Sequence, residues 1–201
     1  SDDYNQSNAN VQVKDSWGIQ KPYNQGDKVI VAIIDTGLDR NHLLFKDSGS
    51  IWDNTVEKNG TPGVDDDGNG LVDDINGWNF VAGSSNVSDD NDHGTHVAGI
   101  VLGVGQDVFA NPVRESKIKI MALKFLDANG SGSTAGAISA MDYAVRNGAK
   151  VINNSWGGPS YSQSLYEAYV AAYNAGVVVV SAAGNSATNN DTAPMYPANF
   201  N

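Results

Sequence analysis

The sequence contains 201 residues, of which 40% are hydrophobic and 17% are charged, and it has no cysteine. A chain of this length and apolar content can bury the core of one compact domain, which excludes a coiled coil or a disordered tail. The lack of cysteine excludes disulfides and thiolate chemistry. No apolar run approaches the roughly 18 residues that span a bilayer, and the first residues lack the pattern of a signal peptide, so we expect no membrane partner.

The formal net charge is −11, and the acidic residues are concentrated in one part of the sequence. Between Asn59 and Val113 there are nine aspartates and neither lysine nor arginine. This excess argues against a nucleic-acid partner, because phosphates need basic contacts. Carboxylates that lie close together repel one another unless something neutralises them, so the same segment favours a bound cation.

Four short apolar runs rich in β-branched residues predict strands that are buried on both faces. They cover residues 29–34, 118–123, 151–153 and 177–181. Helical patterns lie between them, at residues 93–102, 133–147 and 164–174. This alternation predicts an α/β fold, a doubly wound and mostly parallel sheet with helices on both faces. Ligands bind such sheets beyond the carboxyl ends of the strands, so reactive residues are expected directly after the apolar runs.

Two of the predicted helices carry signals at their ends. Ser133 and Ser164 are the expected N-caps, because a serine side chain can accept a hydrogen bond from the first free amides of a helix. Gly148 and Gly176 follow the same helices, where a residue in the left-handed conformation closes the last turn.

Residues 45–88 do not share the strand and helix pattern. They are rich in Gly, Asp and Asn, with one brief apolar stretch at residues 78–81. We interpret them as an acidic, calcium-binding loop region that is inserted within a single domain spanning residues 1–201.

An acidic segment inside this region has the spacing of a calcium-binding loop. Oxygen ligands at relative positions 1, 3, 5, 7 and 9 are offered by Asp65, Asp67, Asn69, the Leu71 carbonyl and Asp73. Position 12 is Asn76 instead of the usual bidentate glutamate, so the match is partial. We predict a calcium ion with a structural role, and a solvated acidic loop is the alternative.

Asp35 directly follows the first predicted strand, in the segment Asp35-Thr36-Gly37. An aspartate at this place is either functional or a turn former. The same three residue types form the signature of aspartic proteases. That class needs a second such motif or a dimer of an all-β fold, whereas this chain is predicted to be α/β.

His93 begins the first predicted helix, where Ala98 and Gly99 allow close packing of that helix. A histidine that acts as a base needs a carboxylate on one ring nitrogen, and Asp35 is placed to supply it. The alternative is that His93 and His96 are surface or capping histidines.

The segments Ile33–Asp39 and His93–Ile100 resemble the aspartate and histidine boxes of the subtilases, a family of serine peptidases. Their order, aspartate before histidine, is also the order in subtilisin. The resemblance implies that His93 is the general base and that Asp35 orients it. It also implies a structural role for His96.

Two later segments extend this resemblance. Val151–Pro159 resembles the strand and substrate-binding edge of the family, and Val177–Ser186 resembles the box that contains its oxyanion asparagine. Asn185 is thus expected to donate its amide to developing negative charge. The substrate backbone is expected to lie as an added strand between Gly130, Ser131 and Gly132 on one side and Ser155, Trp156 and Gly157 on the other. An ordinary glycine loop is the alternative for each segment.

The nucleophilic serine of the family lies in a Gly-Thr-Ser box, and these residues contain no such box. The resemblance covers residues 10–201, so the serine is expected on a further segment, which would be a partner of this chain. A fragment, an intentionally shortened chain and a homologue without catalysis are the three explanations. Alone, the chain is expected to be inactive and of low stability, because an incomplete sheet exposes apolar surface and strand edges.

Together these features predict a serine endopeptidase that acts on proteins or peptides through an Asp-His-Ser triad. The resemblance further implies a propeptide during maturation and a secreted or cell-surface location. The alternative is a non-catalytic, calcium-binding scaffold or pseudoprotease of the same fold. Dinucleotide binding is excluded, because the loop after the first strand is not a glycine-rich phosphate cradle.

Overall fold

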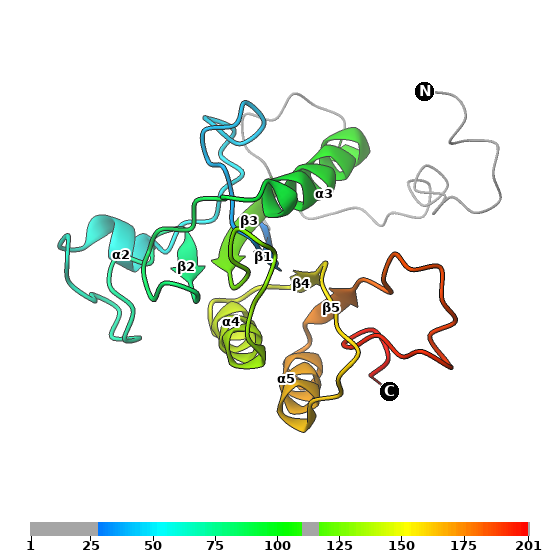
Figure 1. The fold of residues 1–201 in the computed structure, drawn as a ribbon. Helices are drawn as coiled ribbons and strands as arrows, with labels where there is room; N and C mark the ends of the chain where they lie inside the picture. The colour runs from blue at the N-terminus through cyan, green and yellow to red at the C-terminus, as the bar shows by residue number, and fades with distance from the viewer. Residues whose placement is uncertain (1–27, 110–116, 201) are drawn as a thin grey trace.

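The computed structural model describes residues 28–109 and 117–200, and a five-stranded sheet lies at its centre (Figure 1). The strands are β1 (Val29–Asp35), β2 (Gly77–Asn79), β3 (Ile118–Lys124), β4 (Val151–Asn154) and β5 (Val178–Ser181). All neighbouring strands are parallel, in the order β2-β3-β1-β4-β5. β1 is therefore the central strand, and its register with β3 places Asp35 opposite Lys124.

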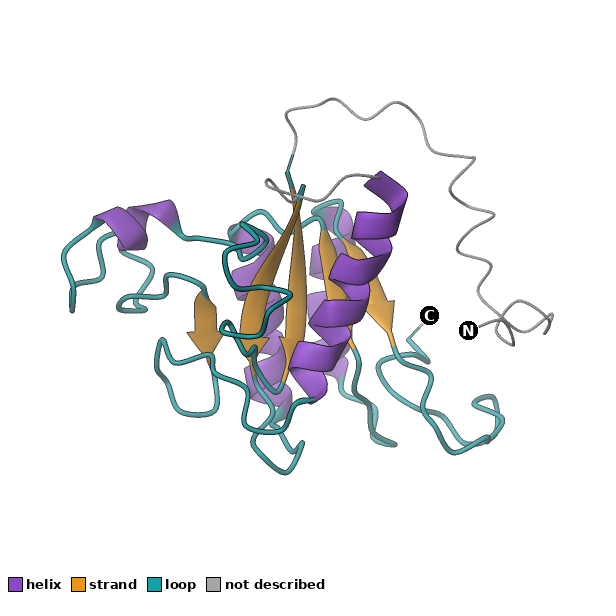
Figure 2. Ribbon diagram, turned by 90° about the horizontal axis from the view of Figure 1, so that it is seen from above, coloured by secondary structure: helices purple, strands orange, loops and turns teal. Residues whose placement is uncertain are grey.

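Helices cover both faces of the sheet, which confirms the predicted fold class. α3 (His93–Phe109) lies on one face, whereas α4 (Thr134–Arg146) and α5 (Gln163–Asn174) lie on the other (Figures 1 and 2). None of the described helices is both long enough and apolar enough to cross a membrane.

Two apolar clusters fill the space between the sheet and these helices. Ala32 and Ile34 of β1 belong to the cluster that includes α4 and α5, while Val31 and Ile33 belong to the cluster that includes α3. These four side chains are between 0% and 6% exposed. A strand with both faces covered has to be apolar at every position, which explains the continuous apolar run in the sequence.

The segment 45–88 contains two short elements that the sequence pattern does not predict. α2 (Thr55–Asn59) is capped by the Asn54 side chain, and β2 pairs with β3 as an edge strand of the sheet. β2 has only three residues, Gly-Trp-Asn, so no run of β-branched residues marks it. The predicted four strands therefore become five.

The helix ends differ from the predictions at two places: α3 continues to Phe109, beyond the predicted end at residue 102, and α5 has another cap. Ser133 caps α4, and Gly148 and Gly176 have positive φ values of 79° and 76°. The prediction that Ser164 caps α5 is wrong, because Ser162 occupies the N-cap and accepts a hydrogen bond from a backbone amide of the first turn. The two serines lie two residues apart and fit the N-cap preference equally well, so composition does not separate them.

β5 forms an open edge of the sheet. Val178 pairs in register with Val151, and Val151 packs against the cluster on the α3 face. Val178 and Val180 on that face are 60% and 49% exposed. α3 thus covers the centre of this face and leaves apolar surface near β5 exposed.

Candidate active site

Asp35 is the last residue of β1, and the residue is fully buried. Its Oδ1 accepts a hydrogen bond of 2.7 Å from the amide of Thr36. A buried carboxylate needs such partners, because burial removes the water that would otherwise solvate its charge. The position at the carboxyl end of the central strand is where a parallel sheet exposes its reactive groups.

His93 is the first residue of α3 and the second partner of this carboxylate. Its Nδ1 lies 2.8 Å from Oδ1 and 3.0 Å from Oδ2 of Asp35, although the two residues are 58 positions apart in the sequence. The imidazole is 47% exposed. When Nδ1–H donates to the carboxylate, the neutral ring keeps Nε2 free of a proton and able to act as a base. The structure thus brings the two predicted residues together.

Gly94 allows the start of α3 to lie close to the end of β1, and Gly37 allows the segment before α3 to do so. A Cβ at Gly94 would lie 2.3 Å from the carbonyl oxygen of Gly37, and a Cβ at Gly37 would lie 2.6 Å from the carbonyl oxygen of Val87. Gly37 also has a φ of +123°, which other residues rarely adopt. The distance between α3 and the end of β1 therefore depends on Gly94, and the approach of residues 87–89 depends on Gly37.

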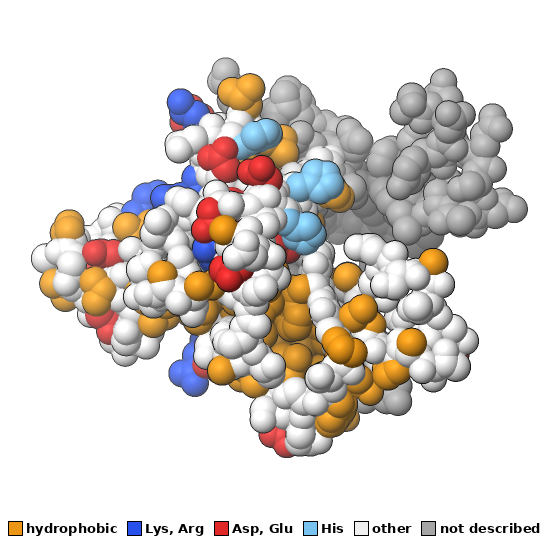
Figure 3. Space-filling view, in the orientation of Figure 1, with side chains coloured by type: hydrophobic (Ala, Val, Ile, Leu, Met, Phe, Trp, Pro, Cys, Tyr) orange, Lys and Arg blue, Asp and Glu red, His pale blue; other side chains and the backbone are white. Residues whose placement is uncertain are grey.

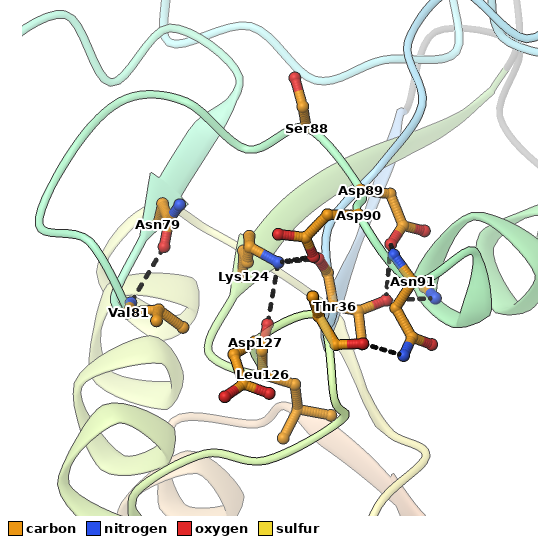
Figure 4. A network of polar contacts seen from close by, with 12 residues as sticks. Thr36, Asn79, Val81, Ser88, Asp89, Asp90, Asn91, Lys124, Leu126 and Asp127 are labelled. Atoms are coloured by element: carbon orange, nitrogen blue, oxygen red, sulfur yellow. Dashed lines mark hydrogen bonds and ion pairs between the residues drawn. The ribbon is translucent and has the colours of Figure 1, made fainter.

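Asp89 ties the end of the strand to the start of the helix (Figure 4). Its carboxylate accepts hydrogen bonds from the hydroxyls of Thr36 at 2.8 Å and Thr95 at 2.6 Å. The Gly94 amide in turn donates to the Thr36 hydroxyl at 2.9 Å. Partial burial raises the pKa of Asp89, but hydrogen bonds, first of all those from Thr95, outweigh burial and hold that pKa below its usual value. Asp89 therefore stays ionised as an anchor.

Lys124, at the end of β3, places a buried cation in the same network (Figure 4). Its ammonium group donates to the carbonyl oxygens of Thr36 and Leu126 and forms an ion pair with Asp90. The sequence pattern does not predict the parts that Lys124 and Asp89 have in this network. Asp89 had a weak signal, since an aspartate shortly before a helix is a usual cap. Lys124 had none, because lysine is almost always exposed.

Two of the segments predicted to bind substrate line one pocket together. The pocket has a volume of about 370 Å³, and Gly130–Gly132, Trp156 and Gly157 contribute to its wall. Phe125, which also lines it, packs against Trp156 with ring centroids 4.8 Å apart. On the face seen in Figure 3, histidine and acidic side chains lie next to one another, and hydrophobic side chains are exposed near them.

The other two predicted residues do not line this pocket. The Ser155 hydroxyl accepts a hydrogen bond of 2.8 Å from the side chain of Asn153 in β4. Asn185 is exposed in the loop after β5, and no hydrogen bond joins it to His93 within residues 28–109 and 117–200. Because β1 and β5 are parallel strands of one sheet, the loop that contains Asn185 and the pair of Asp35 and His93 nevertheless follow the carboxyl ends of strands at the same edge.

The acidic loop surrounds Glu57, a buried carboxylate of α2 that the sequence reading missed. Glu57 is 3% exposed and accepts hydrogen bonds from the amides of Asp66, Asp67 and Asp73. Carboxylate oxygens of Glu57, Asp65 and Asp67 lie within 4.8 Å of one another, close enough to hold one metal ion. Glu57 precedes the loop instead of standing at its position 12, so the spacing rule gave no signal for it.

Two of the remaining predicted ligands, Asn69 and Asp73, have protein partners. Asn69 accepts a hydrogen bond from the Leu71 amide at 2.7 Å, and Asp73 accepts one from a backbone amide at 2.8 Å. Asp74 is fully buried and accepts a hydrogen bond of 2.7 Å from the Tyr143 hydroxyl. Burial raises the pKa of Asp74 in spite of this bond. The fit of the loop to a cation therefore depends on the three clustered carboxylates, whose oxygens are the ligands that calcium prefers.

An aspartate at the end of a central parallel strand, paired with a histidine at the start of a helix, is the site geometry of a subtilisin-type serine peptidase. The family model described as Subtilase family matches residues 26–201. The chain belongs to the subtilase family.

Similar proteins with established names are peptidases of this kind. Subtilisin-like protease 1 of Plasmodium falciparum is 39% identical over 132 residues, which are 66% of this chain and 19% of that protein. Subtilisin DY of Bacillus licheniformis is 35% identical over 88% of this chain and 54% of its own length. Thermitase of Thermoactinomyces vulgaris is 34% identical over 94% of this chain and 57% of its own length. The chain thus spans about half the length of these two bacterial relatives.

A solved structure supports the same fold. The crystal structure of a cold adapted subtilisin-like serine proteinase superposes with a TM-score of 0.57 and 28% sequence identity. The superposition covers 89% of this chain and 55% of that chain.

Proposed function

We propose that this domain is part of an endopeptidase that hydrolyses peptide bonds through a serine nucleophile, with Asp35 and His93 as two members of the triad. The observation that carries the proposal is the 2.8 Å contact between His93 Nδ1 and the buried Asp35 carboxylate. Such a contact fixes the tautomer and the orientation of the imidazole. The serine is proposed to lie in a part of the protein outside these 201 residues.

The proposed reaction has two stages. The serine Oγ attacks the peptide carbonyl carbon while His93 Nε2 accepts the hydroxyl proton, and the amide of Asn185 donates to the developing oxyanion. Protonated His93 then gives this proton to the amine leaving group, and an acyl-enzyme remains. Water hydrolyses the acyl-enzyme with His93 again as the base, while Asp35 stays ionised and stabilises the imidazolium.

The proposed substrate is an extended stretch of a protein or peptide. Its backbone would run beside Gly130–Gly132 and Ser155–Gly157, where glycine leaves room for another main chain. The pocket between the first segment and Trp156 would receive one of its side chains. A propeptide that occupies the same groove during maturation and a secreted or cell-surface location are part of this proposal.

The acidic loop is proposed to bind a structural calcium ion. Glu57, Asp65 and Asp67 would supply carboxylate oxygens, and Asn69, the Leu71 carbonyl and Asp73 remain the further predicted ligands. When bound, the ion neutralises the clustered carboxylates and ties the loop to α2. The support is that oxygens of these three carboxylates lie within 4.8 Å of one another, where a cation would offset their mutual repulsion.

Covalent labelling tests the peptidase proposal. The natural protein that contains this domain should react with a fluorophosphonate probe, because an activated serine attacks phosphorus as it attacks a carbonyl. The His93→Ala variant should lose the label, whereas His42→Ala, a change of another exposed histidine, should keep it. A natural protein that folds and takes no label would contradict the proposal and favour the non-catalytic scaffold.

A further inference from the structure

Five asparagines of the chain are each followed by glycine, and an Asn-Gly pair has a reaction of its own. The backbone nitrogen of the glycine attacks the side-chain carboxamide carbon of the asparagine. A new C–N bond forms, the bond to the side-chain nitrogen breaks, and that nitrogen leaves as ammonia with the proton of the glycine amide. Glycine favours this attack, because no Cβ shields its nitrogen. The five asparagines are Asn59, Asn69, Asn76, Asn129 and Asn147.

The ring that forms in this step is a succinimide, and water opens it in two ways. Attack at one carbonyl carbon gives aspartate, and attack at the other gives isoaspartate, in which the main chain runs through the former side-chain carboxyl carbon. Both products carry a new negative charge. The only co-reactant is water, so an exposed Asn-Gly pair needs no other molecule to react.

The five pairs differ in how the protein holds the asparagine side chain. A side-chain amide that donates a hydrogen bond is fixed in one orientation, and this bond must break before the side chain can turn toward the attacking nitrogen. Four of the five asparagines are fixed in this way. Their acceptors are the carbonyl oxygens of Thr55, Trp52 and Tyr143 and the carboxylates of Asp53, Asp67 and Asp74, at 2.8 to 3.1 Å.

Asn129 is the exception. It is exposed, and its backbone amide donates to the Asp127 carboxylate at 2.8 Å. Its side chain has no hydrogen-bond partner among residues 28–109 and 117–200. The attacking nitrogen does not distinguish the pairs, because all five glycine amides donate a hydrogen bond, that of Gly130 to the Asp127 carbonyl oxygen at 2.9 Å. The free side chain therefore singles out Asn129.

We propose that Asn129 is a self-modification site, which converts to aspartate and isoaspartate faster than the other four asparagines while the protein is folded. The site lies in the loop that continues into Gly130–Gly132, one wall of the pocket described above. Conversion therefore changes the pocket without the action of another enzyme.

Isoaspartate at position 129 alters the shape of this loop. The Asp127 amide donates to the Ser131 carbonyl oxygen at 2.8 Å, and the Ser131 amide donates back to the Asp127 carboxylate at 3.0 Å. Isoaspartate adds one carbon atom to the main chain between these two residues, which strains both bonds. The loop has little room to adjust, because a Cβ at Gly132 would lie only 2.4 Å from the carbonyl oxygen of Phe125.

Both products also change the charge beside the pocket. The new carboxylate lies two residues from Asp127, so the loop carries two negative charges in place of one. The neighbouring Ala128 carbonyl oxygen accepts a hydrogen bond of 2.8 Å from the side chain of Asn91, in the turn before His93. A displaced loop therefore disturbs the histidine side of the site as well as the pocket. This effect on activity rests on the proposed function, whereas the chemical conversion does not.

Peptide mapping tests the conversion. The natural protein that contains this domain is incubated in neutral buffer with a reversible aldehyde inhibitor, which prevents self-digestion, and is then digested with a second protease. Mass spectrometry detects the replacement of NH2 by OH, and an isoaspartyl methyltransferase labels isoaspartate. Asn129 should convert at least about 5-fold faster than each of the other four, the factor by which one ordinary hydrogen bond reduces the free form of a side chain.

The same incubation in denaturant is the control for sequence effects. All five asparagines precede glycine, so without the fold their rates should become similar. The inference is overturned if Asn129 stays unconverted in the folded protein, if another of the five converts as fast, or if Asn129 leads by the same factor in denaturant.

Activity after incubation tests the effect on the pocket. Once the inhibitor is removed, kcat/KM for a quenched peptide should fall in proportion to conversion, because the isoaspartate form should be about 10-fold less active. Asn129→Gln should keep its activity, since glutamine closes a larger ring far more slowly. Asn147→Gln removes another Asn-Gly pair at the end of α4 and should lose activity as the natural protein does.

The outcomes separate this inference from the proposed function. An equal loss of activity in Asn129→Gln and in the natural protein overturns the effect on the pocket. A natural protein that converts Asn129 first but cleaves no peptide overturns the proposed function and supports the modification site.

Discussion

Asp35, His93, Asp90 and Lys124 lie at the edge of the sheet that we propose to be catalytic, called the catalytic edge below. This edge and the acidic loop around Glu57 both bring carboxylates close together, but they compensate the charge differently. At the catalytic edge each carboxylate meets a nitrogen-bearing side chain from another strand or helix. In the loop the carboxylates of Glu57 and Asp65 accept hydrogen bonds from nearby backbone amides.

This difference has a physical meaning. Partners from distant segments cost chain entropy to bring together, so the fold must be complete before the catalytic edge exists. Backbone amides of the same loop are always near, but they carry only partial charges, and three carboxylates within 4.8 Å remain short of positive charge. Activity should therefore depend on single side chains at the catalytic edge. The stability of the acidic loop should instead depend on a divalent cation.

The largest effect is expected from the catalytic pair. His93→Ala should lower kcat of the natural protein about 10⁶-fold and Asp35→Asn about 10⁴-fold, as the equivalent losses do in subtilisin and in a chymotrypsin-like protease. The reason is that the first variant lacks the base and the second holds it in the wrong tautomer. Steady-state cleavage of a quenched peptide measures this, with unchanged melting as evidence of folding. If kcat fell by less than about 10-fold in either variant, the assignment of Asp35 and His93 to the triad would be wrong.

The next effect concerns the oxyanion. Asn185→Ala should reduce kcat by about 10²- to 10³-fold with little change in KM, because the amide acts on charge that develops only in the transition state. Ser186→Ala, in the same exposed loop, is the control and should keep full activity. A rise in KM at constant kcat would instead assign Asn185 to ground-state binding.

Removal of calcium tests the acidic loop. A chelator should lower the melting temperature of the natural protein by about 5 to 10 °C, because ligand at about 100 times its Kd contributes about 2.7 kcal/mol to the free energy of unfolding. Glu57→Gln should reduce this response, while Asp142→Asn on α4 should keep it. A melting temperature that is the same with calcium and with chelator would show that the loop is only solvated.

The smallest effect is expected at the anchor of the catalytic edge. Thr95→Val removes one donor from Asp89 and should lower the free energy of unfolding by about 1 kcal/mol near neutral pH. The pKa of Asp89 is lower in the folded protein than its ordinary value, so its ionised form stabilises the fold above the ordinary pKa. This contribution is lost as the pH falls through the folded pKa.

Denaturant unfolding near neutral pH and near about pH 3 measures the dependence on Asp89. The difference between Thr95→Val and the natural protein should shrink at the lower pH. An equal difference at both pH values would mean that the threonine acts through packing instead of through the carboxylate.

The sequence predicted those parts of the fold that depend on local pattern. The apolar runs of β1 and β3 predict strands, because a strand covered on both faces is apolar along most of its length. β2 could not be predicted, since its three buried residues, Gly-Trp-Asn, are too few for a periodic pattern and include no β-branched residue. The sequence favours Ser164 as the cap of α5 no less than Ser162, which occupies that position, because propensity alone does not fix a boundary.

The candidate site divides in the same way. Asp35 and His93 could be named because each stands at the end or start of a readable element. Glu57 and Lys124 could not, because their importance comes from burial among segments far away in the chain. Residue type and spacing contain no information about such burial.

Gly37 and Gly94 pack closely against each other. These two positions, which have no side chain, are therefore as important for the geometry of the site as Asp35 and His93. A relative that kept both reactive residues but had alanine in place of Gly94 would push the start of its helix away from the strand, and the imidazole would lose its carboxylate. Whether a distant member of the family is an enzyme or a degenerate copy is therefore better judged from these two glycines together with the reactive residues than from the reactive residues alone.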